Sequence, residues 1–237
     1  MSSTEPDQVT RKNLERLSHP AVVAYAVRCA LRVWGRIPRE LRDRNILQKN
    51  EGRIEEMKSA LRLARDYVNS PSASNVEGLR RAVEDIQQID NVFNAGVFLE
   101  PQITNTAHPP RPTILLKIAV LSPPSITALR TLLAAVRAAS CAVQSQAAYG
   151  DSRVICSALD AEAQSKAAER KANKAAQSDL EDLENWSIGV PKEQDGAPAS
   201  PDLDPKKPIL SEHWHLYPDE VPDWFPDAMT NGWVFPN

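Results

Sequence analysis

The fold is decided by the stretch "SHPAVVAYAVRCALRVWGRIP", which runs from residue 18 to residue 38. Ser18 is a suitable helix N-cap, and Pro20 fits the first turn of the helix that follows. Gly35 and Pro38 indicate where that helix ends. Almost every position between these signals is apolar. Because a helix that is apolar nearly all round belongs in the middle of a bundle, we predict the central helix of an all-α protein here.

Arginines form the one polar stripe on this helix. Arg28, Arg32 and Arg36 are spaced four residues apart, so they lie on the same side. The stripe continues into a basic connector with three further arginines, Arg39, Arg42 and Arg44. We predict a working surface that binds an acidic protein partner or the chain's own tail, with contacts from Arg28, Arg32, Arg36 and Arg39. Reversing the three helical arginines should then abolish binding with little change in helix content.

Helical spacing of apolar residues resumes after the connector. Two such faces, over residues 54–68 and 79–93, are separated by a short break, and Ser74 with Glu77 has the spacing of a capping box for the second. We predict that the pair forms an antiparallel helical hairpin. The run "TILLKIAVLS", residues 113–122, fits either a short buried helix or a single strand. We predict a helix, because the sequence shows no partner strand.

Two longer helices are predicted in the second half of the chain. Ser122 and Pro123 open the first, whose apolar face reaches residue 147. Gly150 and Asp151 then supply a turn and an N-cap for a helix from residue 152 to about residue 185. Its seam is mostly alanine, which allows close helix approach but buries little area. The seam residues are Val154, Ala158, Ala161, Ser165, Ala168, Ala172, Ala176, Leu180 and Leu183.

Charged residues indicate the exposed side of this last helix. Glu162, Lys166 and Arg170 are spaced four residues apart, so their side chains are neighbours on one face. We predict that this face is turned toward water.

The composition divides the chain into three parts. We predict a bundle of about six helices within residues 1–187, a polar and proline-rich linker over 188–208, and an extended tail over 209–237. Protease is expected to cut first between Val190 and Lys207, because nicking concentrates in proline-rich linkers.

The tail has the residue types of a contact surface. In "SEHWHLYPDEVPDWFPDAM", residues 211–229, aromatic side chains alternate with carboxylates, and the prolines exclude a helix. Aromatic residues gathered in this way mark contacts. The tail is either a strap across the chain's own basic half or a docking segment captured by another protein, and we favour the strap. The candidate contact residues are Trp214, Tyr217, Trp224 and Phe225.

Length and composition exclude several classes of protein. The chain has 237 residues, of which 42% are hydrophobic, so it can build a sizeable core. No apolar run approaches the roughly 20 residues that span a bilayer, and the N-terminus lacks a signal-peptide pattern. Cys29, Cys141 and Cys156 show no paired spacing, so we predict reduced and mostly buried thiols in a cytoplasmic protein. We expect no membrane partner, and the oligomeric state stays open.

Titratable residues are unevenly distributed beneath a net charge of −3. Residues 11–81 contain sixteen Lys and Arg against eight Asp and Glu, whereas residues 82–237 contain twelve against twenty-one. Such asymmetry marks either a nucleic-acid face with an acidic tail or two parts that attract each other, and we favour the second. Two histidines, His19 and His108, are predicted to lie on the surface.

No motif in the sequence assigns a reaction. The patterns G-x-S-x-G, G-x-G-x-x-G and the P-loop are absent. Metal-ligand residues gather around His213 and His215, but zinc needs three or four matched ligands and this segment is a weak candidate. Cys29 lies among apolar residues, which favours a buried structural thiol over a nucleophile. We therefore expect no enzyme, and we assign no catalytic residue, metal site or cofactor.

The helical motifs resemble a helical immunity-type family of bacteria. In that family an A-x-x-C-A-x-R-V helix precedes an A-I-E-x-A-R helix and alanine-rich helices with an A-A-Y element. The matching residues here are Ala26, Cys29, Ala30, Arg32 and Val33, then more loosely Ala60, Ala64 and Arg65, then Ala147, Ala148 and Tyr149. The resemblance covers about residues 19–185 and ends before the aromatic tail. It implies a protein that acts by contact with another protein.

These observations set two expectations for function. The first is a non-enzymatic protein-binding component, of immunity or regulatory type, in a bacterial toxin or defence system. The alternative is a nucleic-acid-associated adaptor or regulator that uses the arginine stripe. An acidic chain with one basic stripe fits the alternative less well, so we do not expect nucleic acid to be the partner.

Overall fold

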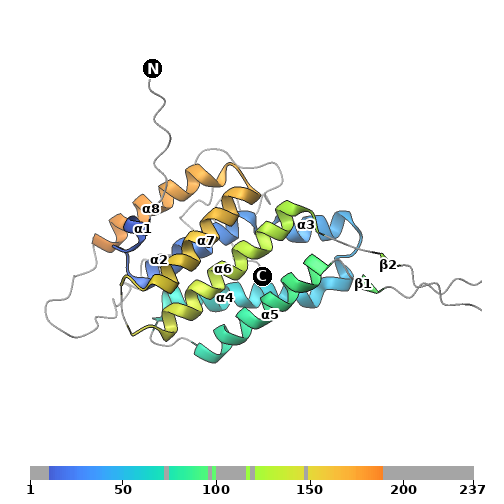
Figure 1. The fold of residues 1–237 in the computed structure, drawn as a ribbon, viewed down its shortest axis with the longest axis horizontal. Coiled ribbons are helices and arrows are strands. Elements are labelled where there is room, and N and C mark those ends of the chain that lie inside the picture. The colour runs from blue at the N-terminus through green and yellow to red at the C-terminus, as the bar shows by residue number, and fades with distance from the viewer. Residues whose placement is uncertain are drawn as a thin grey trace, which may run out of the picture.

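The structure is a computed structural model that describes residues 11–71, 75–95, 98–99, 116–117, 121–146 and 149–188. Its described part is an α-helical bundle, which confirms the predicted all-α fold class (Figure 1). The helices are α1 (Arg11–Leu14), α2 (His19–Trp34), α3 (Arg36–Asp43), α4 (Glu51–Asn69), α5 (Val76–Ala95), α6 (Pro123–Gln144), α7 (Ser152–Ala168) and α8 (Ala172–Ile188), with a 3₁₀ turn at Gln48–Asn50.

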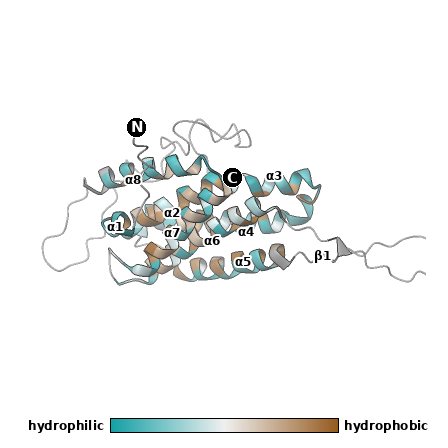
Figure 2. Cartoon of the chain, turned by 45° about the horizontal axis from the view of Figure 1, so that its top comes forward, coloured by the Kyte–Doolittle hydropathy of each residue, from teal (hydrophilic) through white to brown (hydrophobic). Residues whose placement is uncertain are grey.

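Helix α2 is the centre of the bundle. It contacts α4, α6, α7 and α8, and every residue from His19 to Trp34 is buried. The predicted central helix is therefore confirmed, because an apolar surface on all sides requires neighbours on all sides. Figure 2 shows the hydrophobic residues gathered on the inner helices, whereas α3 is largely hydrophilic.

Helix α6 is the second core element. It packs against α2, α3, α4, α5 and α7, and its interior positions are mostly alanine and leucine. Among the described residues it is the one helix long and apolar enough to cross a membrane, although 67% of its apolar window is buried inside the bundle. We expected no apolar run to approach the length that spans a bilayer, and α6 is an exception. A core helix of a soluble bundle has the same composition, so the finding is weak evidence for a membrane.

The elements around the core show how the sequence starts each helix. The expected hairpin is present as α4 and α5, and the side-chain Oδ1 of Asn75 accepts a hydrogen bond from the Gly78 amide at 2.7 Å. Asn75 therefore caps α5 at a position next to the predicted Ser74, which lies outside the described residues. The start of α6 is tied to α3, because the Ser122 amide donates to Glu40 at 2.7 Å.

The structure adds one helix between the main helices and corrects one prediction there. The connector after Gly35 is partly helical, because it forms α3. Residues 116–117, predicted as helix, form strand β2 (Leu116–Lys117), which pairs antiparallel with β1 (Phe98–Leu99) in the register Phe98↔Lys117. A ladder of two residues is too short to show an alternating pattern in sequence.

The single helix predicted from residue 152 to about residue 185 is two helices. Glu169 has extended backbone (φ −147°, ψ 115°), which ends α7 and lets α8 turn back over the bundle. The predicted seam is nevertheless correct, because all nine of its residues are buried. The break thus leaves the apolar seam continuous and changes the direction in which it runs.

Candidate functional site

Arg28 and Arg32 lie in the interior of the bundle. Their exposed fractions are 1% and 0%, and the carboxylate of Asp179 on α8 pairs with both. The Nε atom of Arg28 lies 2.5 Å from Asp179 Oδ1, and Arg32 contacts Asp179 Oδ2. The expectation that these two arginines present a surface stripe is therefore wrong. Their stripe faces a helix of the same chain.

Helix α8 follows the arginine stripe along α2. Arg36 pairs at 2.7 Å with Glu169 in the turn before α8, and Arg32 also donates to the Ala175 carbonyl at 3.2 Å. Because the contacts on α2 run backwards from Arg36 to Arg28 as the chain runs from residue 169 to residue 179, α8 is antiparallel to α2. The small seam residues of α8 let its backbone approach closely enough for one carboxylate to reach two guanidinium groups.

Arg36 and Arg39 differ from the two buried arginines. The side chain of Arg36 keeps 24% of its exposure beside Glu169, whereas Arg39 keeps 53% and lies 3.9 Å from Asp43. Arg42 and Arg44 are exposed as well, and Arg44 pairs with Glu40. Of the predicted stripe, the accessible part is thus confined to α3 and the residue directly after it.

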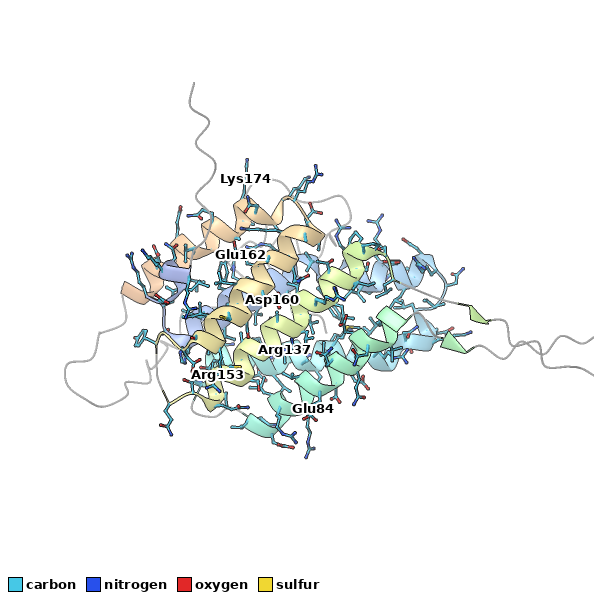
Figure 3. The ribbon with its side chains drawn as sticks, in the orientation of Figure 1. Glu84, Arg137, Arg153, Asp160, Glu162 and Lys174 are labelled. Carbon is cyan, nitrogen blue, oxygen red and sulfur yellow. The ribbon has the colours of Figure 1, made fainter. Side chains whose placement is uncertain are left out.

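A second group of polar residues on α2 and α7 adjoins the arginines. Glu162 lies on α7 (Figure 3), where it is buried and ion-pairs with Lys166. Burial raises the pKa values of Tyr25 and Cys29 on α2, and the charge of Glu162 adds to both shifts. Burial is the largest cause in both cases, and it raises the pKa of Cys29 to about 12. Cys29 is buried, as predicted, and its raised pKa favours the neutral thiol at physiological pH.

The other cysteines only partly match the sequence prediction. Cys141 is half-buried and Cys156 is exposed, so the thiols are less uniformly buried than expected. All three are free.

His19 is buried, which corrects its predicted surface position. It starts α2, and its Nε2 atom accepts a hydrogen bond from the Asp151 amide at 3.4 Å. Burial lowers the pKa of His19, while the charge of Asp151 opposes that shift. Asp151 in turn caps α7 as predicted, because its side chain accepts from the Arg153 amide at 2.8 Å. Gly150 precedes it at φ +73°, a conformation that favours glycine.

The bundle should lose stability on mild acidification through His19. Its pKa is lower in the folded chain than the ordinary value of 6.5, so the folded state resists protonation. The resulting stability is present above pH 6.5 and is lost as the pH falls through the lowered value. We expect the free energy of unfolding, measured by urea titration, to fall between about pH 7 and pH 5. A His19→Gln chain should show a flatter profile, and an unchanged slope would contradict the assignment to His19.

The buried charges pair with each other, and no group of three or more His, Cys, Asp or Glu that could hold a metal occurs among the residues described. His108, His213 and His215 lie outside those residues, as do Trp214, Tyr217, Trp224 and Phe225. The linker and tail predictions therefore stay predictions.

Sequence reasoning missed Asp179 and misplaced Glu162. Asp179 flanks the alanine seam of α8, next to Leu180, where a charged residue is unusual. An acidic residue at the edge of one apolar face, together with arginines on an otherwise apolar helix, is the signal that could have identified the pair. Glu162 was expected on the exposed side of its helix, and its burial is a correction.

No family model, curated protein or solved structure matches this chain. The class of protein is therefore defined by its own architecture. It is an α-helical bundle with a buried arginine–carboxylate cluster between α2 and α8.

Proposed function

We propose that this protein is a non-enzymatic binding component that recognises another protein through its C-terminal tail. The observation that carries the proposal is that exposed large apolar side chains are few among the described residues, whereas aromatic residues are concentrated after residue 208. Val76 and Tyr149 are the large apolar side chains that the described residues expose. The residues after 208 contain four large aromatic residues within twelve positions and no Lys or Arg. Aromatic anchors with surrounding carboxylates are typical of recognition segments.

The docking role gains support over the strap from the position of α8. A strap was expected to place the tail carboxylates on the arginine stripe. Asp179 and Glu169 already pair with Arg28, Arg32 and Arg36. The electrostatic reason for a strap at this place is thereby reduced, and the tail's carboxylates are left to serve a partner.

The biological setting that we propose is a bacterial toxin or defence system, with the protein in an immunity or regulatory role in the cytoplasm. This setting rests on the resemblance of the α2 and α4 sequences to a helical immunity-type family. The residues that carry the first motif, Ala26, Cys29, Ala30, Arg32 and Val33, are all buried. With α8 in place they serve packing, so they are not part of the tail-dependent recognition surface.

The nucleic-acid alternative is weakened by the same burial. Phosphate contacts need accessible cations, and Arg28 and Arg32 do not meet that requirement. Two of the remaining arginines, Arg39 and Arg44, already have carboxylate partners on α3.

Tail variants test the proposal in a neutralisation assay. Products of neighbouring genes would be expressed one at a time in host cells, and growth would be measured with and without this chain. We expect the intact chain to bind and neutralise one such product. The double variant Trp214→Ala/Trp224→Ala should lose this effect because the aromatic anchors are removed.

Thermal stability of the same chains provides the control. We expect removal of residues 209–237 to leave the melting temperature unchanged, because a docking segment adds nothing to the isolated bundle. A clear drop in melting temperature with loss of blue-shifted tryptophan fluorescence would support the strap instead. Binding that survives both tail changes would contradict the proposal.

A further inference from the structure

The interface between α2 and α8 combines a buried ionic contact with small apolar side chains, which is unusual for a permanent interface. Asp179 is fully buried and holds both Arg28 and Arg32. Among the α8 side chains that the structure describes, the buried apolar ones are three alanines, Ala172, Ala175 and Ala176, and two leucines, Leu180 and Leu183. Alanine side chains bury little area, so the ionic contact carries a large share of the attachment along these residues. Among the pairs of described elements with extensive contact, α8 meets only α2 and α7.

Helix α8 is also peripheral in the bundle. It lies along one edge, and its far side is hydrophilic (Figures 1 and 2). Asn173 and Lys174 on that side are exposed, and Figure 3 shows Lys174 on the outer side of the helix. The turn before α8 is held by the pair of Arg36 and Glu169, which is partly open to water. A peripheral helix with few buried apolar contacts is the kind of element that opens locally while the rest of a fold stays packed.

The arginines explain how the chain tolerates such an opening. Replacing a buried ion pair by packed apolar residues is often neutral or stabilising, so a permanent contact has no need of two buried arginines. A face of α2 that is sometimes exposed to water benefits from two arginines. Without α8, this side of α2 presents guanidinium groups instead of aliphatic side chains, which keeps the uncovered face soluble.

We propose that the Arg28–Arg32 face of α2 is a binding site for an acidic helix of a partner protein, and that α8 is its occupant within the chain. The structure of α8 defines the partner's chemistry: small residues toward α2 and one carboxylate at the place of Asp179. Two arginines recognise that carboxylate through charge-assisted hydrogen bonds. The proposal rests on the proposed function in one respect, that the partner is a protein.

A peptide with the sequence of α8 tests the site in the full-length chain. The probe is a fluorescent peptide of residues 172–188, and the receptor is the chain with Asp179→Asn, in which the attachment of α8 is weakened. We expect the peptide to bind this variant at least about tenfold more tightly than the wild-type chain, because it supplies the missing carboxylate. The matched peptide with Asp179→Asn should bind the same variant at least about tenfold more weakly than the probe.

Competition separates a helix site from a general anion site. Unlabelled α8 peptide should displace the probe, whereas inorganic phosphate at equal ionic strength should not. Equal displacement by phosphate would overturn the proposal, as would equal binding of the two peptides.

Hydrogen exchange on the wild-type chain keeps the proposal testable if the Asp179→Asn variant does not fold. We expect amides of α8 to exchange through an opening that leaves α2, α6 and α7 protected. Exchange of α8 only with the whole bundle would overturn the proposal. Neither readout depends on residues 209–237, so this inference can fail while tail-dependent binding persists, and the reverse.

Discussion

Reversing Arg28 and Arg32 to glutamate is expected to expel α8 from α2 and to destabilise the bundle strongly. Each replacement would place a buried carboxylate against Asp179, which is itself fully buried. Breaking one buried pair costs about 3–5 kcal/mol, and like charges add to that cost. The total reaches the stability of a typical domain, about 5–15 kcal/mol. Far-UV circular dichroism should show a partial loss of helix and a lower unfolding midpoint, in contrast to the binding defect alone that a surface stripe would produce.

The matched control is the double reversal Arg39→Glu/Arg42→Glu. Both side chains are exposed on α3, a few residues along the same stretch of sequence. Surface changes of this kind usually shift stability by less than about 0.5 kcal/mol each. The two double variants carry the same change in net charge, so they differ only in where the new carboxylates are placed. Equal stability of the two would show that the α2 arginines are not paired in the interior.

Replacing Asp179 with alanine is expected to lower the free energy of unfolding by about 3–5 kcal/mol. The change removes the carboxylate and leaves two guanidinium groups buried without it. Urea titration followed by circular dichroism measures the effect as a fall in midpoint. Asp160→Ala on the exposed side of α7 is the control, with an expected change below about 0.5 kcal/mol.

An apolar replacement of the whole cluster should behave differently. The triple variant Arg28→Met/Arg32→Met/Asp179→Leu removes every charge of the cluster, so no ionised group remains without its partner. Its stability is expected to equal that of the wild-type chain or to exceed it by about 1–4 kcal/mol. A triple variant as unstable as Asp179→Ala would show that packing, rather than charge, decides the stability of this interface.

The core of the fold could be predicted from local patterns. The all-round apolar character of residues 19–34 placed α2 at the centre, and the alanine seam of α7 and α8 was predicted correctly across its break. Both follow from burial periodicity, which a single sequence contains. The break itself has no glycine or proline, since it runs Glu169–Arg170–Lys171. At this break Glu169 forms an ion pair with Arg36, a residue distant in sequence, and no local pattern reveals such a contact.

The candidate site was harder to predict for the same reason. Arginine is rarely buried, so a stripe of arginines on a helix indicates a surface unless its partner is known. That partner, Asp179, lies 151 residues from Arg28 in the chain. Nothing in the spacing around either residue connects them, and only the fold brings them together.

This separation also sets the order of events during synthesis. At about 5–20 residues per second, a ribosome needs roughly 8–30 s to reach Asp179 after making Arg28. During that time α2 acquires its neighbours in chain order, first α4, then α6 and α7, and finally α8. An aliphatic helix left uncovered in this way would be a target for aggregation and for chaperones. Arg28 and Arg32 give the nascent helix a hydrated side until the last helix of the bundle is translated and covers it.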